Sequence, residues 1–367
     1  HFCGASKSGL RCCEKMRAAK PIPARAFKMV DDPTGACQVV HSAQGEPQVL
    51  VDVDQRAANG VHAADERIDK PPGTVRFVCI SDTHSFESRA HRLNGSTALD
   101  SVPDGDVLLH CGDFTNVGRL EEVEAFARWF GALPHERKIL IAGNHDLSME
   151  ACTYEATSKR FGAFSTTGEP FDAASVCAKA RAAIDAIPNC EYLCDSGTSV
   201  QGITVWGSPW QPSFCDWAFN LPRGAHCRAK WELIPAGTDI VLTHGPPLGH
   251  GDLCEPGHHR AGCLDLLDEL QNRVKPQYHC FGHIHEGWGV TTDGVTRYVN
   301  ASTCNLRYRP VNTPIVFDVD VPVRAIKAPE PVLQTAAAPS AAPLALPREM
   351  TPAASAQSQN QPLIIQR

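Results

Sequence analysis

Five short segments of this chain place carboxylate, amide and imidazole side chains within a few residues of one another. Oxygen and imidazole ligands in this mixture suit Zn, Mn, Fe or Ni, whereas a calcium site would use oxygen ligands alone. The segments are "SDTHS" (81–85), "CGDFT" (111–115), "AGNHD" (142–146), "THGPP" (243–247) and "FGHIH" (281–285). Their side chains of chemical interest are Asp82, His84, Asp113, Asn144, His145, His244, His283 and His285.

These side chains offer more ligands than one tetrahedral ion accepts, whereas two ions that share a bridging carboxylate would use them. Two metals about 3.5–4 Å apart can bind phosphate oxygens, activate a bridging water and stabilise in-line displacement at phosphorus. Bound water has a pKa near 7 instead of about 15.7. This difference is worth on the order of 10 kcal/mol in forming the nucleophile. The residue types therefore indicate phosphoester hydrolysis.

Each segment directly follows a short apolar run. The runs are rich in Val and Ile and bounded by glycine, which is typical of buried strands. Because ligands in α/β sheets cluster at the carboxyl ends of strands, we expect the five segments to meet there. The runs are "VRFVCI", "VLLH", "KILIA", "DIVLT" and "YHCF".

The spacing of the first three segments indicates strands that are joined by crossover helices. Asp113 follows Asp82 by 31 residues, and Asn144 follows Asp113 by the same interval, which is enough for a strand, a helix and a return. In "LEEVEAFARWF" the apolar side chains fall on one helical face. Helices are predicted at 120–130, at about 173–186 and at about 263–274, the last two ending before prolines.

The second half of the domain adds strands and a hairpin. "GITVWG" and "PIVFDVD" are predicted strands, and "GVTTDGVTRYVN" is a predicted hairpin that turns at Asp293 and Gly294. Alternating strands and helices followed by late hairpins favour a mixed, layered α/β architecture.

The five segments, in this order, resemble the pattern D-x-H, G-D-x, G-N-H-[DE], H-G and G-H-x-H of the calcineurin-like metallophosphoesterase superfamily. The resemblance spans about residues 73–320 and implies a layered α/β/β/α sandwich of two mixed β-sheets flanked by helices. "SPWQPSFCDWAFNLPRG", "FGHIHEGWG" and "YVNAST" resemble the brain metallophosphoesterase-domain-containing proteins, which act on cyclic nucleotides among other phosphoesters. Members with glycine in place of the first histidine of the last block are weak enzymes, and here His283 is present.

The resemblance also implies a role for each side chain. One metal would be held by Asp82, His84, Asp113 and His285, and the second by Asp113, Asn144, His244 and His283, so that Asp113 bridges them. His145 would face the substrate and stabilise phosphorane charge or protonate the leaving oxygen, while Asp146 would orient its imidazole. Manganese is the metal expected in vitro. An extended backbone would point His283 and His285 to the same side, although each would serve a different metal.

Several other side chains allow two interpretations. In the aromatic segment, Trp210 could stack on a nucleobase and Arg223 could pair with phosphate, or the segment could be a lid that covers the core. His110 and His279 are expected in the core or behind the ligands, and His250, His258 and His259 in a solvated loop. Cys254, His258, His259 and Cys263 lack the spacing of a structural zinc site.

Composition sets the limits of the domain and of its partners. Residues 1–72 are expected to be a largely irregular extension, 73–320 the metallophosphoesterase domain, and 321–367 a disordered tail rich in Pro, Ala and Gln. The net charge of −7 argues against a nucleic-acid polymer as partner, and no apolar run is long enough to span a membrane. Sixteen cysteines in a chain of this length favour reduced thiols and a cytoplasmic location. An organelle is the alternative location, because the first thirty residues are basic.

The leading hypothesis is a dinuclear metal-dependent phosphodiesterase that hydrolyses small phosphodiesters, such as cyclic nucleotides, by attack of a metal-bridging hydroxide. A phosphomonoesterase or a protein phosphatase is the alternative enzyme, since the same metals serve both reactions. A non-catalytic scaffold of the same fold is the alternative outside enzymes.

Overall fold

The computed structural model describes residues 40–41, 47–48, 61–63, 69–86, 99, 102–163, 172–254 and 259–322. All of them belong to one of two units into which the chain divides, residues 1–327. The expected tail, 321–367, lies outside the described residues except for 321 and 322. The boundaries of the expected domains stay predictions.

The first sheet carries three of the five ligand segments. In the described part of the chain it has six strands in the order β3-β18-β4-β5-β6-β7, of which β4 to β7 are parallel and β18 pairs antiparallel with both β4 and β3. Its register sets Ile80, His110 and Leu140 level with one another, so the three following loops leave at one edge. The strands are β3 (Val61–Ala63), β4 (Thr74–Ile80), β5 (Val107–His110), β6 (Arg137–Leu140), β7 (Cys190–Tyr192) and β18 (Ile315–Asp320).

The second sheet carries the other two ligand segments. Its six described strands have the order β16-β17-β15-β12-β9-β8, with β9, β12, β15 and β17 parallel and the outer strands β8 and β16 antiparallel. The strands are β8 (Ser196–Val200), β9 (Ile203–Ser208), β12 (Ile240–Thr243), β15 (Tyr278–Phe281), β16 (Gly289–Thr292) and β17 (Arg297–Asn300). The predicted hairpin is β16 and β17, and Gly294 in its turn has a positive φ of 89°.

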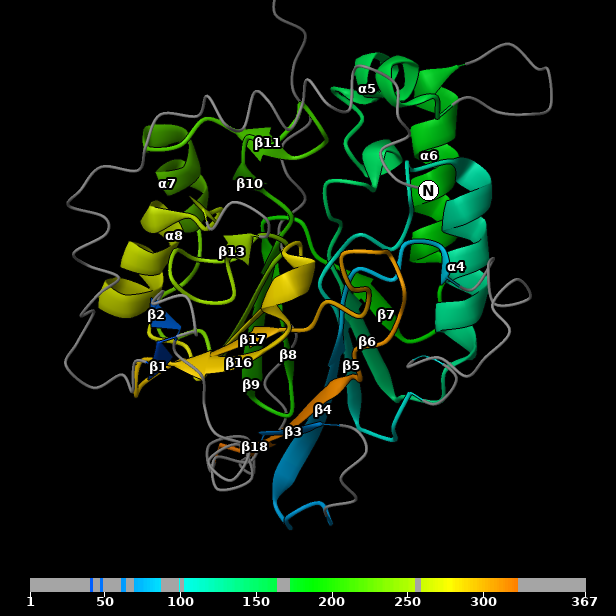
Figure 1. The fold of residues 1–367 in the computed structure, drawn as a ribbon. Helices are drawn as coiled ribbons and strands as arrows, with labels where there is room; N and C mark the ends of the chain where they lie inside the picture. The colour runs from blue at the N-terminus through cyan, green and yellow to red at the C-terminus, as the bar shows by residue number, and fades with distance from the viewer. Residues whose placement is uncertain are drawn as a thin grey trace, which may run out of the picture. The chain divides into compact units, whose positions relative to one another are not determined.

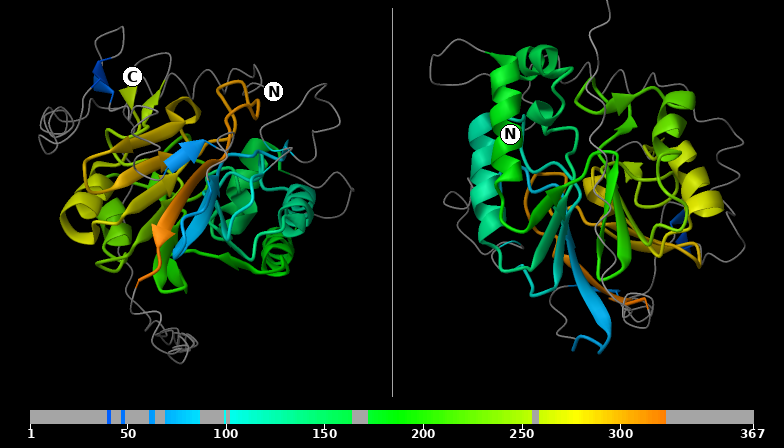
Figure 2. Two further views of the ribbon diagram at one scale, coloured as in Figure 1. Left: turned by 90° about the horizontal axis from the view of Figure 1, so that it is seen from below. Right: turned by 180° about the vertical axis from the view of Figure 1, so that it is seen from behind.

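The two sheets pack face to face, and helices cover their outer faces, as Figures 1 and 2 show. Alternate side chains of β4 divide between two cores: Phe77 faces the second sheet, and Ile80 faces α4 and α6. On the other side, Trp231 of α7 and Leu266 of α8 pack on the second sheet. The helices are α4 (Leu120–Ala132), α5 (Tyr154–Phe161), α6 (Ala173–Asp185), α7 (Ala225–Trp231) and α8 (Leu264–Glu269). This arrangement confirms the predicted α/β/β/α sandwich.

The predicted helices occur close to their expected positions, each with a local cause. Glu122, in the first turn of α4, accepts a hydrogen bond from the backbone N–H of Arg119. Asp172 caps α6 by accepting from the backbone of Ala174 and Ser175. The third helix is shorter than predicted, because α8 gives way to a π-helical turn (Leu270–Val274).

Shorter elements complete the described chain, and several of them were not predicted from the sequence. The strand β3 comes from the extension that we expected to be largely irregular. The remaining elements are β1 (Val40–His41), β2 (Pro47–Gln48), β10 (Gln211–Pro212), β11 (Asn220–Leu221), β13 (Leu253–Cys254), β14 (His259–Arg260), and the 3-10 turns η3 (Leu147–Met149) and η5 (His285–Gly287).

The described cysteines match the predicted redox state except at one position. Cys215 is disulfide-bonded, so the prediction of reduced thiols fails there. The other cysteines of the described residues are free thiols. Within the same residues, no helix is both long and apolar enough to cross a membrane.

We expect Phe317→Ala to lower the free energy of unfolding by about 3–5 kcal/mol, measured by urea denaturation. The Phe317 ring lies between the sheets, 5.4 Å from the ring of Phe77 and 4.0 Å from that of Tyr278, so its removal leaves a cavity at the junction. Val295→Ala is the control, because Val295 is 62% exposed and should change stability by less than about 0.5 kcal/mol. Equal stability of the two variants would contradict this account of the core.

Candidate metal centre

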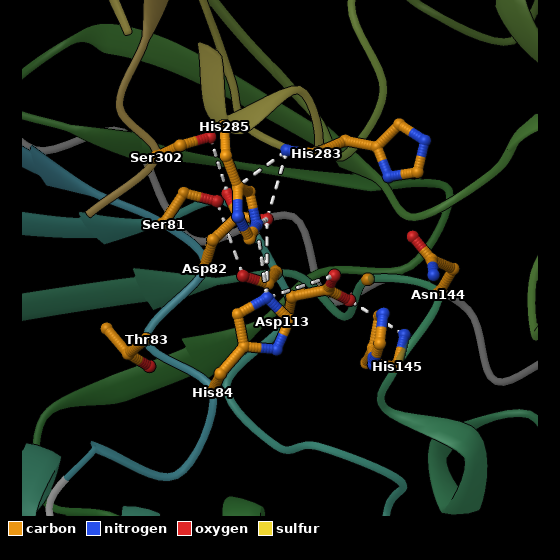
Figure 3. A network of polar contacts seen from close by, with 12 residues as sticks. Ser81, Asp82, Thr83, His84, Asp113, Asn144, His145, His283, His285 and Ser302 are labelled. Atoms are coloured by element: carbon orange, nitrogen blue, oxygen red, sulfur yellow. Dashed lines mark hydrogen bonds and ion pairs between the residues drawn. The ribbon is translucent and has the colours of Figure 1, made fainter. Parts of the chain in front are cut away.

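The predicted ligands meet at the carboxyl ends of the strands of both sheets (Figure 3). Three groups of side chains place possible ligand atoms within 4.8 Å of one another. His84 and Asp113 each belong to two of these groups, and Oδ2 of Asp113 lies 3.8 Å from Nε2 of His84 and 3.2 Å from Nε2 of His244, between the two predicted metals. The groups are Asp82, His84 and His285; His84, Asp113 and His145; and Asp113, His244 and His283.

Backbone carbonyls fix the tautomer of three histidines. The Nδ1 atoms of His84, His244 and His285 lie 3.2, 2.8 and 3.1 Å from the carbonyl oxygens of Thr115, Cys111 and Asn305, respectively. A carbonyl only accepts, so each Nδ1 carries a hydrogen and donates it. The opposite atom, Nε2, is thereby left to bind a metal, as in many metal-ligating histidines.

The first group fits a cation. Nε2 of His285 lies 3.2 Å from Nε2 of His84 and 3.3 Å from Oδ1 of Asp82. Two lone pairs that face each other at this distance repel unless a cation or a proton lies between them. The donor set of one carboxylate and two imidazoles is one that divalent transition metals accept. The residues present therefore fit the first predicted metal.

The group of Asp113, His244 and His283 fits a cation for similar reasons. Nε2 of His244 lies 3.2 Å from Oδ2 of Asp113 and 3.0 Å from Oδ1 of Asn144. When the His244 imidazole is neutral, its Nε2 and these two oxygens are all acceptors, and a cation among them relieves their repulsion. His283 completes the group, and Figure 3 shows its ring on the side of Asp113 where Asn144 lies.

The centre requires very close approach of backbone segments. The Asp82 carboxylate accepts hydrogen bonds from the backbone N–H of His283 at 3.0 Å and from the hydroxyl of Ser302 at 2.9 Å. A Cβ atom at Gly282 would overlap this carboxylate, and one at Gly143 would overlap that of Asp113. Glycine is therefore required at both positions.

The ligands also sit on left-handed backbone. The φ angles of Asp82, His84, Asp113 and His283 are 52°, 46°, 57° and 68°. Asp and His enter this region more readily than most residues, but it remains costly for any side chain with a Cβ. The angle at His283 corrects one prediction: β15 ends at Phe281, so His283 and His285 do not lie on an extended segment. The bend lets the two rings join different ligand groups.

Asp146 has a different role from the one predicted. Its carboxylate accepts hydrogen bonds from the backbone N–H groups of Asp113 at 2.9 Å, Thr115 at 2.8 Å and Gly143 at 2.8 Å, and from the Thr115 hydroxyl at 2.7 Å. These contacts tie the loop after β5 to the loop after β6. The prediction that Asp146 orients His145 is therefore wrong, and the backbone carbonyl of Asn116 holds Nδ1 of His145 at 2.7 Å instead.

His145 lies against the ligand groups and is supported by an aromatic stack. Its backbone N–H donates to Oδ1 of Asp113 at 2.7 Å. Its ring stacks on Trp217, with centroids 4.1 Å apart, and Trp217 stacks on Phe161 at 3.6 Å. With Nδ1 held by a carbonyl, Nε2 is the atom available to a substrate.

The two predicted substrate contacts have other partners. The indole N–H of Trp210 donates to the Asp195 carboxylate at 3.0 Å, and the ring packs in the core. The guanidinium of Arg223 donates to the backbone carbonyls of Ala261 and Gly262 at 2.6 Å. Both side chains hold the fold together, so the structure does not support Trp210 and Arg223 as substrate ligands. The aromatic side chains of this segment that reach the centre are Trp217 and Phe214, whose ring lies 5.5 Å from that of His283.

Other histidines behave partly as expected. His110 and His279 are buried behind the ligands, where they contact the hydroxyls of Thr83 and Thr243 at 3.1 and 2.8 Å. His250 is buried and stacked on Tyr298, so the expectation of a solvated position is wrong there. His258 lies outside the described residues. Among the residues that are described, Cys254, His259 and Cys263 form no group able to hold a metal.

Sequence reasoning missed the segment that closes the centre on the side of the first group. The ring of Tyr308 lies 4.8 Å from that of His84 and 5.2 Å from that of His285. The carbonyl of Asn305 orients His285. The sequence "NLRYRP" that contains both residues matches no motif of metal ligands or catalytic residues. Only its position shortly after "YVNAST" could have indicated that it lies near the metal centre.

The chain belongs to the calcineurin-like phosphoesterase family, whose profile matches residues 75–287, more than half of the chain. The family hydrolyses phosphoesters and implies a dinuclear divalent metal centre. Metallophosphoesterase domain-containing protein 1 of Homo sapiens is 47% identical over 256 residues, which cover 69% of this chain and 73% of that protein. UPF0046 protein T07D4.2 of Caenorhabditis elegans is 38% identical over 330 residues, 87% of this chain and 75% of that protein. The predicted resemblance is confirmed.

We expect Asp146→Asn to lower the free energy of unfolding by about 3 kcal/mol in urea denaturation. The change leaves one acceptor oxygen and turns an NH₂ group toward backbone N–H donors. The matched control is Asp216→Asn, because Asp216 is 68% exposed in its ion pair with Arg160 and should contribute less than about 1 kcal/mol. An Asp146→Asn variant as stable as the control would contradict the structural role of Asp146.

Metal affinity should rise with pH up to about pH 9. Burial lowers the pKa of His244, but the charges of Asp113 and Asp82 outweigh it and raise the pKa to about 9. Without metal, the imidazole is therefore protonated below that pH, and an ion must displace the proton to bind. Calorimetric titration of the metal-free protein with Mn²⁺ should show the apparent Kd falling by about tenfold per pH unit between pH 6 and 8. A Kd independent of pH would exclude His244 as a ligand.

Proposed function

We propose that this protein is a dinuclear metal-dependent phosphodiesterase that acts on small phosphodiesters, with cyclic nucleotides among the candidates and Mn²⁺ as the ion that activates it in vitro. The observation that carries the proposal is the position of the Asp113 carboxylate, whose Oδ2 lies 3.8 Å from Nε2 of His84 and 3.2 Å from Nε2 of His244, with His145 beside it. A single carboxylate between two such groups is what a pair of ions requires in order to hold one phosphoryl group.

The chain's residues divide the work of the reaction. Asp82, His84, Asp113 and His285 would hold one ion, and Asp113, Asn144, His244 and His283 the other; together the ions supply charge for the phosphoryl oxygens and a more acidic water. Because its Nδ1–H is donated to the carbonyl of Asn116, His145 presents Nε2 to the substrate, and as the imidazolium it would deliver the Nε2 proton to the leaving ester oxygen. Trp217 limits the rotation of the His145 ring by stacking on it.

The surroundings of the ligand groups favour a small organic ester. Phe214 and Tyr308 place aromatic rings beside His283 and His84, respectively. Such rings offer flat apolar surfaces on which a nucleobase or a similar group can stack. This surface supports a small-molecule phosphodiester over a phosphoprotein as the substrate.

With Mn²⁺ present, the protein should hydrolyse bis(p-nitrophenyl) phosphate and cyclic nucleotides with a larger kcat/KM than p-nitrophenyl phosphate or a phosphopeptide. Asp113→Ala should abolish all turnover, because both ions lose a ligand. His145→Ala should lower kcat by about a hundredfold or more for a cyclic nucleotide. The loss for the nitrophenyl ester should be smaller, since nitrophenolate leaves without being protonated.

His226→Ala is the control, because this histidine is exposed on α7 away from the ligands. A preference for the monoester or the phosphopeptide would instead assign a phosphomonoesterase or a protein phosphatase. Metal-loaded protein without turnover on the whole panel would favour a scaffold. Equal losses on both diesters in His145→Ala would remove the general-acid role from His145.

A further inference from the structure

A cavity of about 460 Å³ adjoins the metal centre on the side of the first ligand group. His285 lines it and also contacts Asp82 and His84, so the cavity and the centre share this side chain. Its other walls include Asn305, Leu306, Arg307, Arg309 and Val311. Apart from His285, the residues that line this cavity take no part in the reaction proposed above.

Two arginines give this cavity a positive wall. Neither the Arg307 nor the Arg309 guanidinium has a hydrogen bond or an ion pair with any residue that the structure describes. Arg76 and Arg228 do have such partners, Asp318 and Asp265, whereas Arg128 of α4 also has none among the described residues but does not line this cavity. Glu286 also lines the cavity. The formal charges of Arg307, Arg309 and Glu286 therefore sum to one positive charge. In a chain with a net charge of −7, two arginines left for a ligand are a specific local feature.

Hydrogen bonds hold the backbone of the loop that carries both arginines. The Asn305 side-chain oxygen accepts hydrogen bonds from the backbone N–H groups of Arg307 at 2.9 Å and Arg309 at 3.2 Å. The N–H of Asn305 donates to the carbonyl of Arg309 at 2.9 Å, which closes the loop. Tyr308, between the two arginines, has its ring against His84 and His285. One loop therefore contacts the metal ligands through its middle residue and lines the cavity through the residues on either side.

The cavity also has an apolar part. Leu306 and Val311 line it and are 50% and 55% exposed, which is unusual among the large apolar side chains that the structure describes. Arginine binds phosphate or carboxylate oxygens with paired donors, and Leu306 and Val311 provide contact for the carbon skeleton between two charged groups. The lining thus matches a ligand that is anionic at one end and organic beside it.

We propose that this cavity binds a second anionic group of the substrate, so that preferred substrates are small phosphodiesters whose organic part carries another phosphate or carboxylate. The reacting phosphodiester occupies the centre, the organic part passes His285 and Leu306, and the second anion pairs with Arg307 and Arg309. This inference rests on the proposed function and narrows its class of substrate.

The test compares two nucleotides that differ by one phosphate. Thymidine 5′-(p-nitrophenyl phosphate) has the diester alone, and its 3′-phosphorylated form has the same diester and a second anion. Nitrophenolate release by the Mn²⁺-loaded protein should give a kcat/KM about tenfold larger for the 3′-phosphorylated form, mainly through a lower KM. In the double variant Arg307→Gln/Arg309→Gln this ratio should fall to about one. Arg181→Gln, which removes an exposed arginine of α6, should keep the ratio of the wild type.

A double variant that keeps the tenfold ratio would overturn the proposal, as would a wild-type ratio of one. If neither diester is hydrolysed, the proposed function fails. Equilibrium binding then tests separately whether the cavity binds an anion. Calorimetry would then compare thymidine 3′,5′-bisphosphate with thymidine 5′-phosphate on the Mn²⁺-loaded protein. Tighter binding of the bisphosphate that disappears in the double variant supports the anion site, and equal affinities exclude it. A thermal melt of each variant shows that the loop change has not unfolded the protein.

Discussion

The position of the whole centre depends on one buried carboxylate that binds no metal in the proposed scheme. Asp146 accepts hydrogen bonds from the backbone around Asp113 and from Gly143, and so joins two loops that leave neighbouring strands. An uncompensated charge in this place would be unstable, and four or more directed N–H and O–H donors make it tolerable. Because this contact fixes the loop that carries Asp113, the Asp113 carboxylate stays between His84 and His244.

A second constraint follows from how tightly the ligand loops approach one another. Gly282 and Gly143 leave no room for a Cβ atom beside the ligand carboxylates, and Asp82, Asp113 and His283 adopt left-handed backbone. These positions are therefore restricted twice, once by the chemistry of metal binding and once by sterics. Strain of this kind persists only where surrounding contacts determine the conformation, and here the packed sheets provide those contacts.

These constraints explain how far the sequence could predict the structure. Strand ends could be predicted because apolar runs and polar ligands alternate clearly, and parallel register then brings the ligands together. The role of Asp146 could not, since a carboxylate that accepts backbone hydrogen bonds has the same sequence signature as one that orients a histidine. The two interpretations of Trp210 and Arg223 could not be separated from the sequence, because their partners, Asp195 and the 261–262 carbonyls, are distant in sequence. The contact of Tyr308 with the ligands depends on loop geometry that no short pattern encodes.

The ligands come from both sheets of the sandwich, so bound metals would affect stability as well as chemistry. Asp82 and His84 follow a strand of the first sheet, whereas His285 follows β15 of the second, so the first group spans the gap between the layers. Any ion bound there cross-links the sheets in the way that a covalent bridge would. Its binding free energy therefore opposes separation of the sheets. The gain in the free energy of unfolding rises with the logarithm of the free ion concentration once that concentration exceeds the Kd. The protein's resistance to unfolding is thereby coupled to the supply of metal around it.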